Sequence, residues 1–208
     1  MNPFPRTWID VDLGAIRDNL GWLRGRLPDG VKVALVAKAD AYGHGLVPVG
    51  RYAAENGADW LCVATVQEGL SLRDAGVESP ILVLSPILPV EAEQAVFYDL
   101  RITLERAETA RAVSEAASGQ NRVAKVHLEV DTGLARFGAM PNEVLDLARQ
   151  IAADPHLELE GVCQHFIDIG NDPDTTALQM GLFRAVLDAI EAGGVTLPMV
   201  HAANSAGA

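Results

Sequence analysis

The sequence predicts an α/β fold in which helices cover a parallel sheet, and three observations support this. Apolar runs of strand length alternate with segments of helical periodicity along the whole chain. These runs stay apolar instead of alternating with polar residues, which is typical of strands buried on both faces. No linker, low-complexity segment or sequence repeat interrupts this order. The 208 residues, 49% of them hydrophobic, fit one domain with a buried core.

Each element is predicted by its own local signals. Apolar residues at helical spacing over 16–27 indicate the first helix, and the Pro-Asp-Gly segment at 28–30 ends it. Thr65 and Glu68 have the spacing of a capping box, which predicts a helix that Gly76 closes. We expect strands at residues 31–38, 60–65, 80–85, 100–105, 123–131, 157–166 and 198–204, with helices between them, the last over about 176–192.

Seven strands of this kind suit either a doubly wound sheet or most of an eight-stranded barrel. A dinucleotide-binding doubly wound fold needs a G-x-G-x-x-G turn directly after its first strand, whereas residues 39–45 read ADAYGHG. We therefore predict a (β/α)8 barrel of the TIM type that is incomplete within residues 1–208. It would contain about seven βα units and lack the eighth strand.

Composition and charge exclude several functions. The net charge of -12 argues against a nucleic-acid-binding surface, which needs clustered lysine and arginine. Cys62 and Cys163 lie in apolar runs without metal-ligand spacing, so we expect buried, reduced thiols and no metal site. No apolar run approaches the length of a membrane span, and the N-terminus lacks the pattern of a signal peptide. We expect a cytoplasmic protein that binds neither nucleic acid nor membrane.

Polar side chains follow the ends of several predicted strands. In a β/α barrel, functional groups lie at the carboxyl ends of the strands. The polar residues at these ends include Lys38, Tyr42, Arg136, His165, Asn204 and Ser205. Each of them alone is compatible with an ordinary structural role. Because the barrel would bring them to one face, we predict that they share a site.

This set of residue types suits one cofactor. A lysine amine that condenses with an aldehyde is the standard attachment for pyridoxal phosphate. Hydroxyl groups and the backbone N–H groups of a small-residue turn suit its phosphate. An arginine suits its phenolic oxygen and a substrate carboxylate. The residues therefore predict a pyridoxal phosphate site centred on Lys38.

Four segments resemble the bacterial alanine racemases. ALVAKADAYGHG (34–45) is similar to the motif of their cofactor lysine, and VHLEVDTGLARFG (126–138) is similar to a second motif. HAANSAG (201–207) resembles a third, and GVCQHF (161–166) resembles the strand that carries the ring-side histidine. Their order agrees with the N-terminal part of that family. The resemblance implies that residues 1–208 form one pyridoxal-phosphate-binding barrel, without the family's C-terminal β-domain.

The resemblance also implies a reaction and the role of its lysine. The family interconverts L- and D-alanine with pyridoxal phosphate, and D-alanine serves bacterial cell-wall synthesis. Lys38 would hold the cofactor as an aldimine and act as one of two acid/base groups. Tyr42 and Ser205 would donate hydrogen bonds to the phosphate.

The remaining roles implied by the resemblance lie around the ring. Arg136 would bond the phenolic oxygen and line the site of the substrate carboxylate. His165 would lie beside the ring and support an arginine that contacts the pyridine nitrogen, and Asn204 would steady the same corner. We expect His44 to have a structural role within its turn.

The sequence departs from the family in two ways. The pyridine-contacting arginine belongs to an eighth strand, and the second base is a tyrosine of the C-terminal domain that acts across a homodimer. Neither lies in residues 1–208, so we expect weak or no racemisation from this chain alone, and its own oligomeric state stays open. Glu129 replaces a lysine that is carbamylated in many relatives, and we expect its carboxylate to pair with Arg136.

Two other classes remain open alongside the racemase. One is a single-domain carrier of pyridoxal phosphate with the same barrel, although such proteins usually lack the AYGHG continuation at 41–45. The other is a decarboxylase of the same fold type, for which the DTGLARFG pattern at 131–138 is a poorer match.

Overall fold

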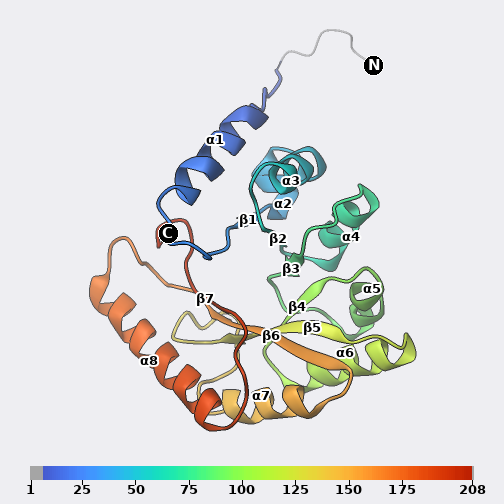
Figure 1. The fold of residues 1–208 in the computed structure, drawn as a ribbon, viewed down its shortest axis with the longest axis vertical. Coiled ribbons are helices and arrows are strands. Elements are labelled where there is room, and N and C mark those ends of the chain that lie inside the picture. The colour runs from blue at the N-terminus through green and yellow to red at the C-terminus, as the bar shows by residue number, and fades with distance from the viewer. Residues whose placement is uncertain (1–6, 208) are drawn as a thin grey trace.

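The computed structural model describes residues 7–207 and contains one parallel sheet of seven strands in chain order. The strands are β1 (Ala34–Val36), β2 (Trp60–Val63), β3 (Ile81–Val83), β4 (Arg101–Leu104), β5 (Ala124–Val130), β6 (Leu157–Gln164) and β7 (Val200–His201). Each strand pairs in parallel with the next along the chain, so their carboxyl ends lie at one edge of the sheet. Figure 1 shows the sheet bent into an arc. This confirms the predicted α/β class and the partial barrel of seven strands.

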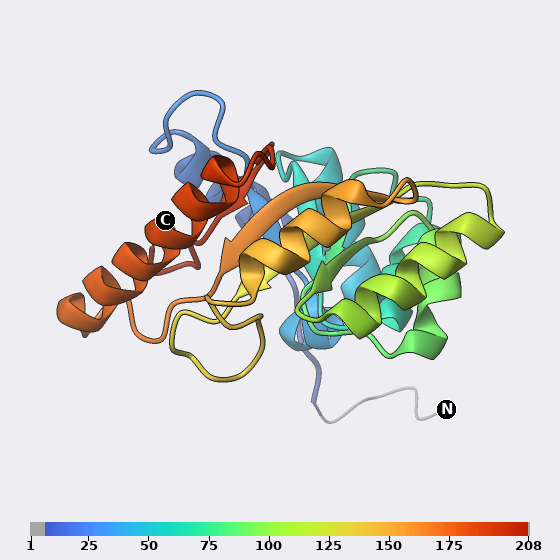
Figure 2. The same cartoon turned by 90° about the horizontal axis from the view of Figure 1, so that it is seen from below.

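Helices cover the outer side of the arc (Figure 1). They are α1 (Leu13–Arg24), α2 (Lys38–Gly43), α3 (Leu46–Glu55), α4 (Val66–Asp74), the short η1 (Pro89–Glu91), α5 (Ala92–Phe97), α6 (Ala107–Gly119), α7 (Val144–Ala153) and α8 (Pro173–Ala192). Figure 2, seen from below, shows α6, α7 and α8 side by side across one part of this outer layer. Among residues 7–207, no helix is long and apolar enough to span a membrane.

The core lies between the sheet and the outer helices. Leu61, Ile81 and Ile102 on neighbouring strands are completely buried. Helix α7 covers the sheet with apolar residues at helical spacing, among them Val144 and Ile151, which are also completely buried. The alternation of apolar runs and helical patterns in the sequence therefore corresponds to the two layers of the fold.

The concave side of the sheet is partly polar. Near the amino ends of the strands, Glu160 accepts hydrogen bonds from Lys125 at 3.3 Å and Arg101 at 3.3 Å, and lies 3.2 Å from a ring nitrogen of His127. Burial alone would raise the pKa of Glu160, but the His127 contact and the positive charges outweigh it and lower that pKa to about 2. A ring nitrogen of His127 also lies 2.8 Å from one of His201 on β7. These five residues form one connected polar cluster.

Most of the local sequence signals are confirmed. Thr65 Oγ1 accepts a hydrogen bond from the Glu68 N–H at 3.2 Å, and the Glu68 carboxylate accepts one from the Thr65 N–H, which completes the capping box. Cys62 and Cys163 are free and buried, and burial raises the pKa of the Cys62 thiol to about 12.

The two outermost strands are shorter than predicted. Only Ala34–Val36 of the run 31–38 and only Val200–His201 of the run 198–204 form strand pairs. Within the described residues each of these two strands pairs with one neighbouring strand only. Residues 1–6, on which the expectation about a signal peptide partly depends, lie outside the described residues.

Candidate functional site

Lys38 begins an unusual turn at the carboxyl end of β1. It is half-buried and is followed by four residues, Ala39–Tyr42, whose φ angles lie between 52° and 55°. This is the left-handed region, which costs an L-residue roughly 1–2 kcal/mol. A run of four such residues without glycine persists only where surrounding contacts hold it, and such strain gathers at functional sites.

Hydrogen bonds within the turn hold part of it. The Ala41 N–H donates to the Ala37 carbonyl at 2.8 Å, and Asp40 Oδ1 accepts from the Leu46 N–H at 2.7 Å, which ties the turn to the start of α3. His44 Nδ1 lies 2.9 Å from the Ala41 carbonyl, in agreement with its expected structural role. The Tyr42 side chain, by contrast, is 60% exposed.

Arg136 lies in a compact loop after β5. Asp131 Oδ1 accepts hydrogen bonds from the N–H groups of Gly133 and Ala135 at 2.9 and 3.1 Å. Gly138 has φ +107°, and a Cβ at that position would lie 2.5 Å from the backbone nitrogen of Asp131. Only glycine therefore allows the chain to fold back so closely. The loop presents Arg136 as an exposed side chain.

A buried glutamine that sequence reasoning did not single out joins the Arg136 loop to the His165 segment. Gln179 on α8 is 2% exposed, and its Nε2 donates to Thr132 Oγ1 at 2.9 Å and to the His165 carbonyl at 3.1 Å. Its Oε1 accepts from the Ile167 N–H at 3.0 Å. Thr132 in turn donates to Gln164 Oε1 at 2.7 Å. The one signal in the sequence that could have identified Gln179 is that this polar residue lies on the buried face of a helix.

The last two predicted residues lie in the turn after β7. Asn204 Oδ1 accepts a hydrogen bond from the Ala206 N–H at 3.1 Å, so its side chain shapes this turn. The Ser205 side chain is exposed. Within residues 7–207, no hydrogen bond or ion pair joins Tyr42 or Ser205 to Lys38, Arg136 or His165.

The charges of two predicted residues, Arg136 and Lys38, act on a third, His165. His165 is an exposed residue, but desolvation of its ring by the surrounding chain, together with the positive charges of Arg136 and Lys38, still lowers its pKa. These side chains come from the loops after β1, β5 and β6, so the fold brings together groups that are far apart in the sequence. The two positive charges favour the neutral form of this imidazole near pH 7.

The expected ion pair between Glu129 and Arg136 is absent from the described part of the chain, so this expectation was wrong. Glu129 is 8% exposed, whereas Arg136 is an exposed residue of the folded-back loop, with its guanidinium carbon 5.2 Å from the centre of the Phe137 ring. Burial raises the pKa of Glu129 to about 7. The charge of Arg136 opposes this shift, and the nearby carboxylates of Glu105 and Asp131 add to it.

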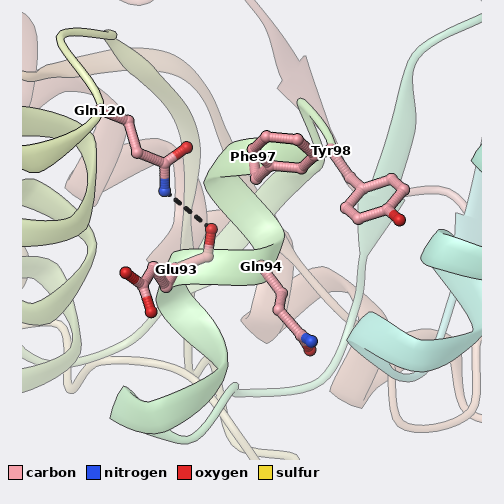
Figure 3. A pocket seen from close by; sticks show the side chains of 5 residues that line it. All are labelled: Glu93, Gln94, Phe97, Tyr98 and Gln120. Atoms are coloured by element: carbon pink, nitrogen blue, oxygen red, sulfur yellow. Dashed lines mark hydrogen bonds between the residues drawn. The ribbon is translucent and has the colours of Figure 1, made fainter.

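A cavity of about 300 Å³ opens beside Arg136, lined by Glu105, Arg106, Asp131, Ala135, Arg136, Phe137 and Gly138. A larger pocket of about 370 Å³ lies between α5 and α6, where the Gln120 amide donates to the Glu93 carbonyl at 2.8 Å (Figure 3). Helices α5 and α6 end at this pocket, just before β4 and β5 begin. The larger pocket therefore lies at the amino edge of the sheet, opposite the carboxyl edge that carries Lys38. The convergent charged groups favour the carboxyl edge as the functional site.

Comparison with known proteins assigns the chain and its fold to a family. The family model described as "Alanine racemase, N-terminal domain" matches residues 11–208. The chain belongs to the alanine racemase family. It is 43% identical over 203 residues to the alanine racemase of Symbiobacterium thermophilum, a match that covers 97% of this chain and 53% of that protein.

Solved structures agree with this assignment. The alanine racemase from Bacillus anthracis with bound L-Ala-P has a TM-score of 0.90 at 36% identity, over 98% of this chain and 53% of that one. A histidine racemase from Leuconostoc mesenteroides matches with a TM-score of 0.83 at 27% identity, over 93% of this chain and 52% of that one. The chain therefore spans about half the length of the relatives it matches.

Proposed function

We propose that this chain is the cofactor-binding barrel of a pyridoxal-phosphate-dependent racemase that acts on alanine. The observation that carries the proposal is that Lys38, Arg136 and His165 follow three strands of one parallel sheet at its carboxyl edge. An amine, a guanidinium and an imidazole in one place suit a cofactor with an aldehyde, a phenolic oxygen and an aromatic ring. Alanine is favoured over other amino acids by the relatives named above, one of which is nonetheless a histidine racemase.

The residues present fit the cofactor by their chemistry. Lys38 is half-buried next to the left-handed turn, and its amine would bond the aldehyde end of the cofactor. The exposed hydroxyls of Tyr42 and Ser205 would donate to the phosphate. Arg136, which forms no ion pair within the described residues, is free to bond the phenolic oxygen. When bound, the cofactor withdraws electrons from an attached amino acid and acidifies its Cα–H bond.

The chain's own side chains would then position the substrate and move the proton. Arg136 would hold the substrate carboxylate, and its positive charge would orient the amino acid toward Lys38. Lys38 Nζ would accept or return the proton at Cα on its own side. The imidazole of His165, neutral because its pKa is lowered, would pack beside the ring without adding a third positive charge. Asn204 would stabilise the turn after β7, which carries Ser205, through its hydrogen bond with the Ala206 N–H.

Inversion at Cα requires a proton acceptor on one face and a donor on the other. Arg136 stays protonated. The family resemblance gives Tyr42 to the phosphate and His165 to the ring side, which leaves Lys38 as the acid/base group of the predicted set. We infer that the second acid/base group comes from outside the predicted set. Losing one such group typically costs about 10²–10⁴ in rate, so racemisation by this chain alone should be correspondingly slow. Homodimerisation belongs to the same proposal for the whole protein.

The proposal is tested by adding pyridoxal phosphate to the purified chain and recording the visible absorbance of the lysine-bound cofactor. Lys38→Ala should remove this absorbance, and Lys32→Ala, which changes an exposed residue before β1, should leave it unchanged. A chiral assay for D-alanine formed from L-alanine distinguishes the classes. Binding without any turnover would favour a carrier, release of carbon dioxide a decarboxylase, and absorbance retained by Lys38→Ala would refute the assigned lysine.

A further inference from the structure

One carboxylate connects the turn after β1 to the end of β2. Glu68 Oε1 accepts a hydrogen bond from the Ala39 N–H at 2.7 Å. Its Oε2 accepts from the N–H groups of Ala64 at 2.7 Å and Thr65 at 3.2 Å. Both oxygens of this half-buried side chain are therefore engaged, and each serves a different strand end.

The helix cap explains only half of this arrangement. In a capping box, the acidic side chain reaches back to the backbone N–H of the N-cap residue, which is Thr65 here, and Oε2 does this. The bond from Ala39 comes from a residue 29 positions earlier and belongs to no helix cap. Oε1 thus has a function outside α4.

That function concerns the residue directly after Lys38. Ala39 is the first of the four left-handed residues, and its side chain is exposed, so packing gives it little support. A charged acceptor makes a stronger hydrogen bond to a backbone N–H than a neutral one does. The Glu68 carboxylate supplies such an acceptor at the point where the chain turns left-handed.

We propose that Glu68 is a positioning residue for Lys38. By holding the Ala39 N–H against the end of β2, it stabilises the left-handed turn and so fixes the direction in which the Lys38 side chain leaves the backbone. The consequence for cofactor attachment rests on the proposed function, whereas the effect on the turn does not.

The test compares Glu68→Gln with Thr65→Ala. An amide has one acceptor oxygen, so Glu68→Gln cannot serve both strand ends. Thr65→Ala removes the other half of the same capping box, the bond from the Glu68 N–H to Thr65 Oγ1, and leaves Oε1 with Ala39. Both variants weaken the start of α4, and only the first is expected to release the turn.

Hydrogen exchange on the cofactor-free chain gives the first readout. We expect amides in the peptide covering residues 37–45 to exchange about tenfold faster in Glu68→Gln than in Thr65→Ala, because the turn opens more often. Exchange in α4 itself should rise by a similar factor in both variants. Equal exchange of the turn in the two variants would overturn the inference.

The second readout is the rate at which pyridoxal phosphate is trapped on Lys38 by borohydride, followed by peptide mass mapping. It should fall about tenfold in Glu68→Gln and little in Thr65→Ala. Adding Ala39→Gly to Glu68→Gln should restore much of the rate, since glycine adopts the left-handed region without steric cost. Rates that fall equally in the two single variants, or no recovery in the double variant, would contradict the positioning role.

The two proposals fail in different ways. If the unaltered chain does not react at Lys38, the proposed function is wrong, and the exchange experiment still decides the role of Glu68. If Glu68→Gln alone does not fold, the double variant with Ala39→Gly takes its place. Its folding would support a role for Glu68 in holding the turn, and its failure to fold would count against one.

Discussion

Replacing Glu129 by glutamine should stabilise the protein, and increasingly so as the pH rises. Glu129 is a β5 side chain that is 8% exposed, without an ion-pair partner among the described residues. Burial raises its pKa from 4.5 to about 7, so the folded state resists ionisation of this carboxyl more than the unfolded state does. Glutamine has nearly the same shape as the protonated acid and never ionises.

The difference between the folded and unfolded pKa of Glu129 sets the size of the effect. For a carboxyl whose pKa is raised on folding, stability is fully present below pH 4.5 and is lost as the pH rises through about 7. A tenfold change in the acid dissociation constant corresponds to about 1.4 kcal/mol, so Glu129→Gln should gain about 3 kcal/mol at pH 8.5. At pH 5.5 the folded carboxyl is already protonated, and the expected gain is only about 1 kcal/mol.

Urea unfolding at the two pH values measures this difference directly. Glu55→Gln, a change of the same type at an exposed residue at the end of α3, is the matched control and should alter stability by less than about 0.5 kcal/mol at either pH. A Glu129→Gln variant that is less stable than the parent at pH 8.5 would refute the reasoning. It would mean that a close partner, most simply Arg136, compensates the ionised carboxylate in solution.

Three further substitutions test other parts of the structure, each by urea unfolding. Glu160→Gln should lower the free energy of unfolding by about 3 kcal/mol near pH 7, because its basic neighbours lose their carboxylate partner. Folding lowers the pKa of Glu160 from 4.5 to about 2, so this difference between variant and parent should disappear as the pH falls from 4.5 toward 2. Gln179→Leu should cost about 2–3 kcal/mol by leaving buried polar partners unpaired, whereas the same change at exposed Gln150 should be nearly silent. Gly138→Ala should cost about 3 kcal/mol because its Cβ meets backbone, while Gly181→Ala, in open space within α8, should gain about 1 kcal/mol.

Signals that act within one element were readable from the sequence. The apolar runs predicted the strands because both faces of a parallel sheet are buried, and the spacing of Thr65 and Glu68 predicted the start of α4 because a cap involves only adjacent residues. The prediction of one shared edge for the site residues needed only chain order and parallel pairing. Strand lengths at β1 and β7 were overestimated because pairing depends on a neighbour that the local sequence does not reveal.

Other features depend on contacts between distant segments. The left-handed turn after Lys38 contains no glycine, and local preference alone would have excluded it. Contacts beyond the turn support it: the Glu68 carboxylate accepts a hydrogen bond from the Ala39 N–H, and the Asp40 side chain accepts one from the Leu46 N–H at the start of α3. Gln179 joins two loops of the site for the same reason, since burial leaves its amide no partners except those loops.

The sequence by itself therefore determined the layers of the fold, the family to which its motifs point and the edge of the sheet where the candidate residues gather. Only the tertiary structure decided how Glu129 and Arg136 lie: it buried the first on β5 and left the second exposed on the loop that follows. The residue types in the sequence determine which charges the chain carries. Burial and backbone direction, which arise from packing between segments far apart in the chain, decide which of those charges meet.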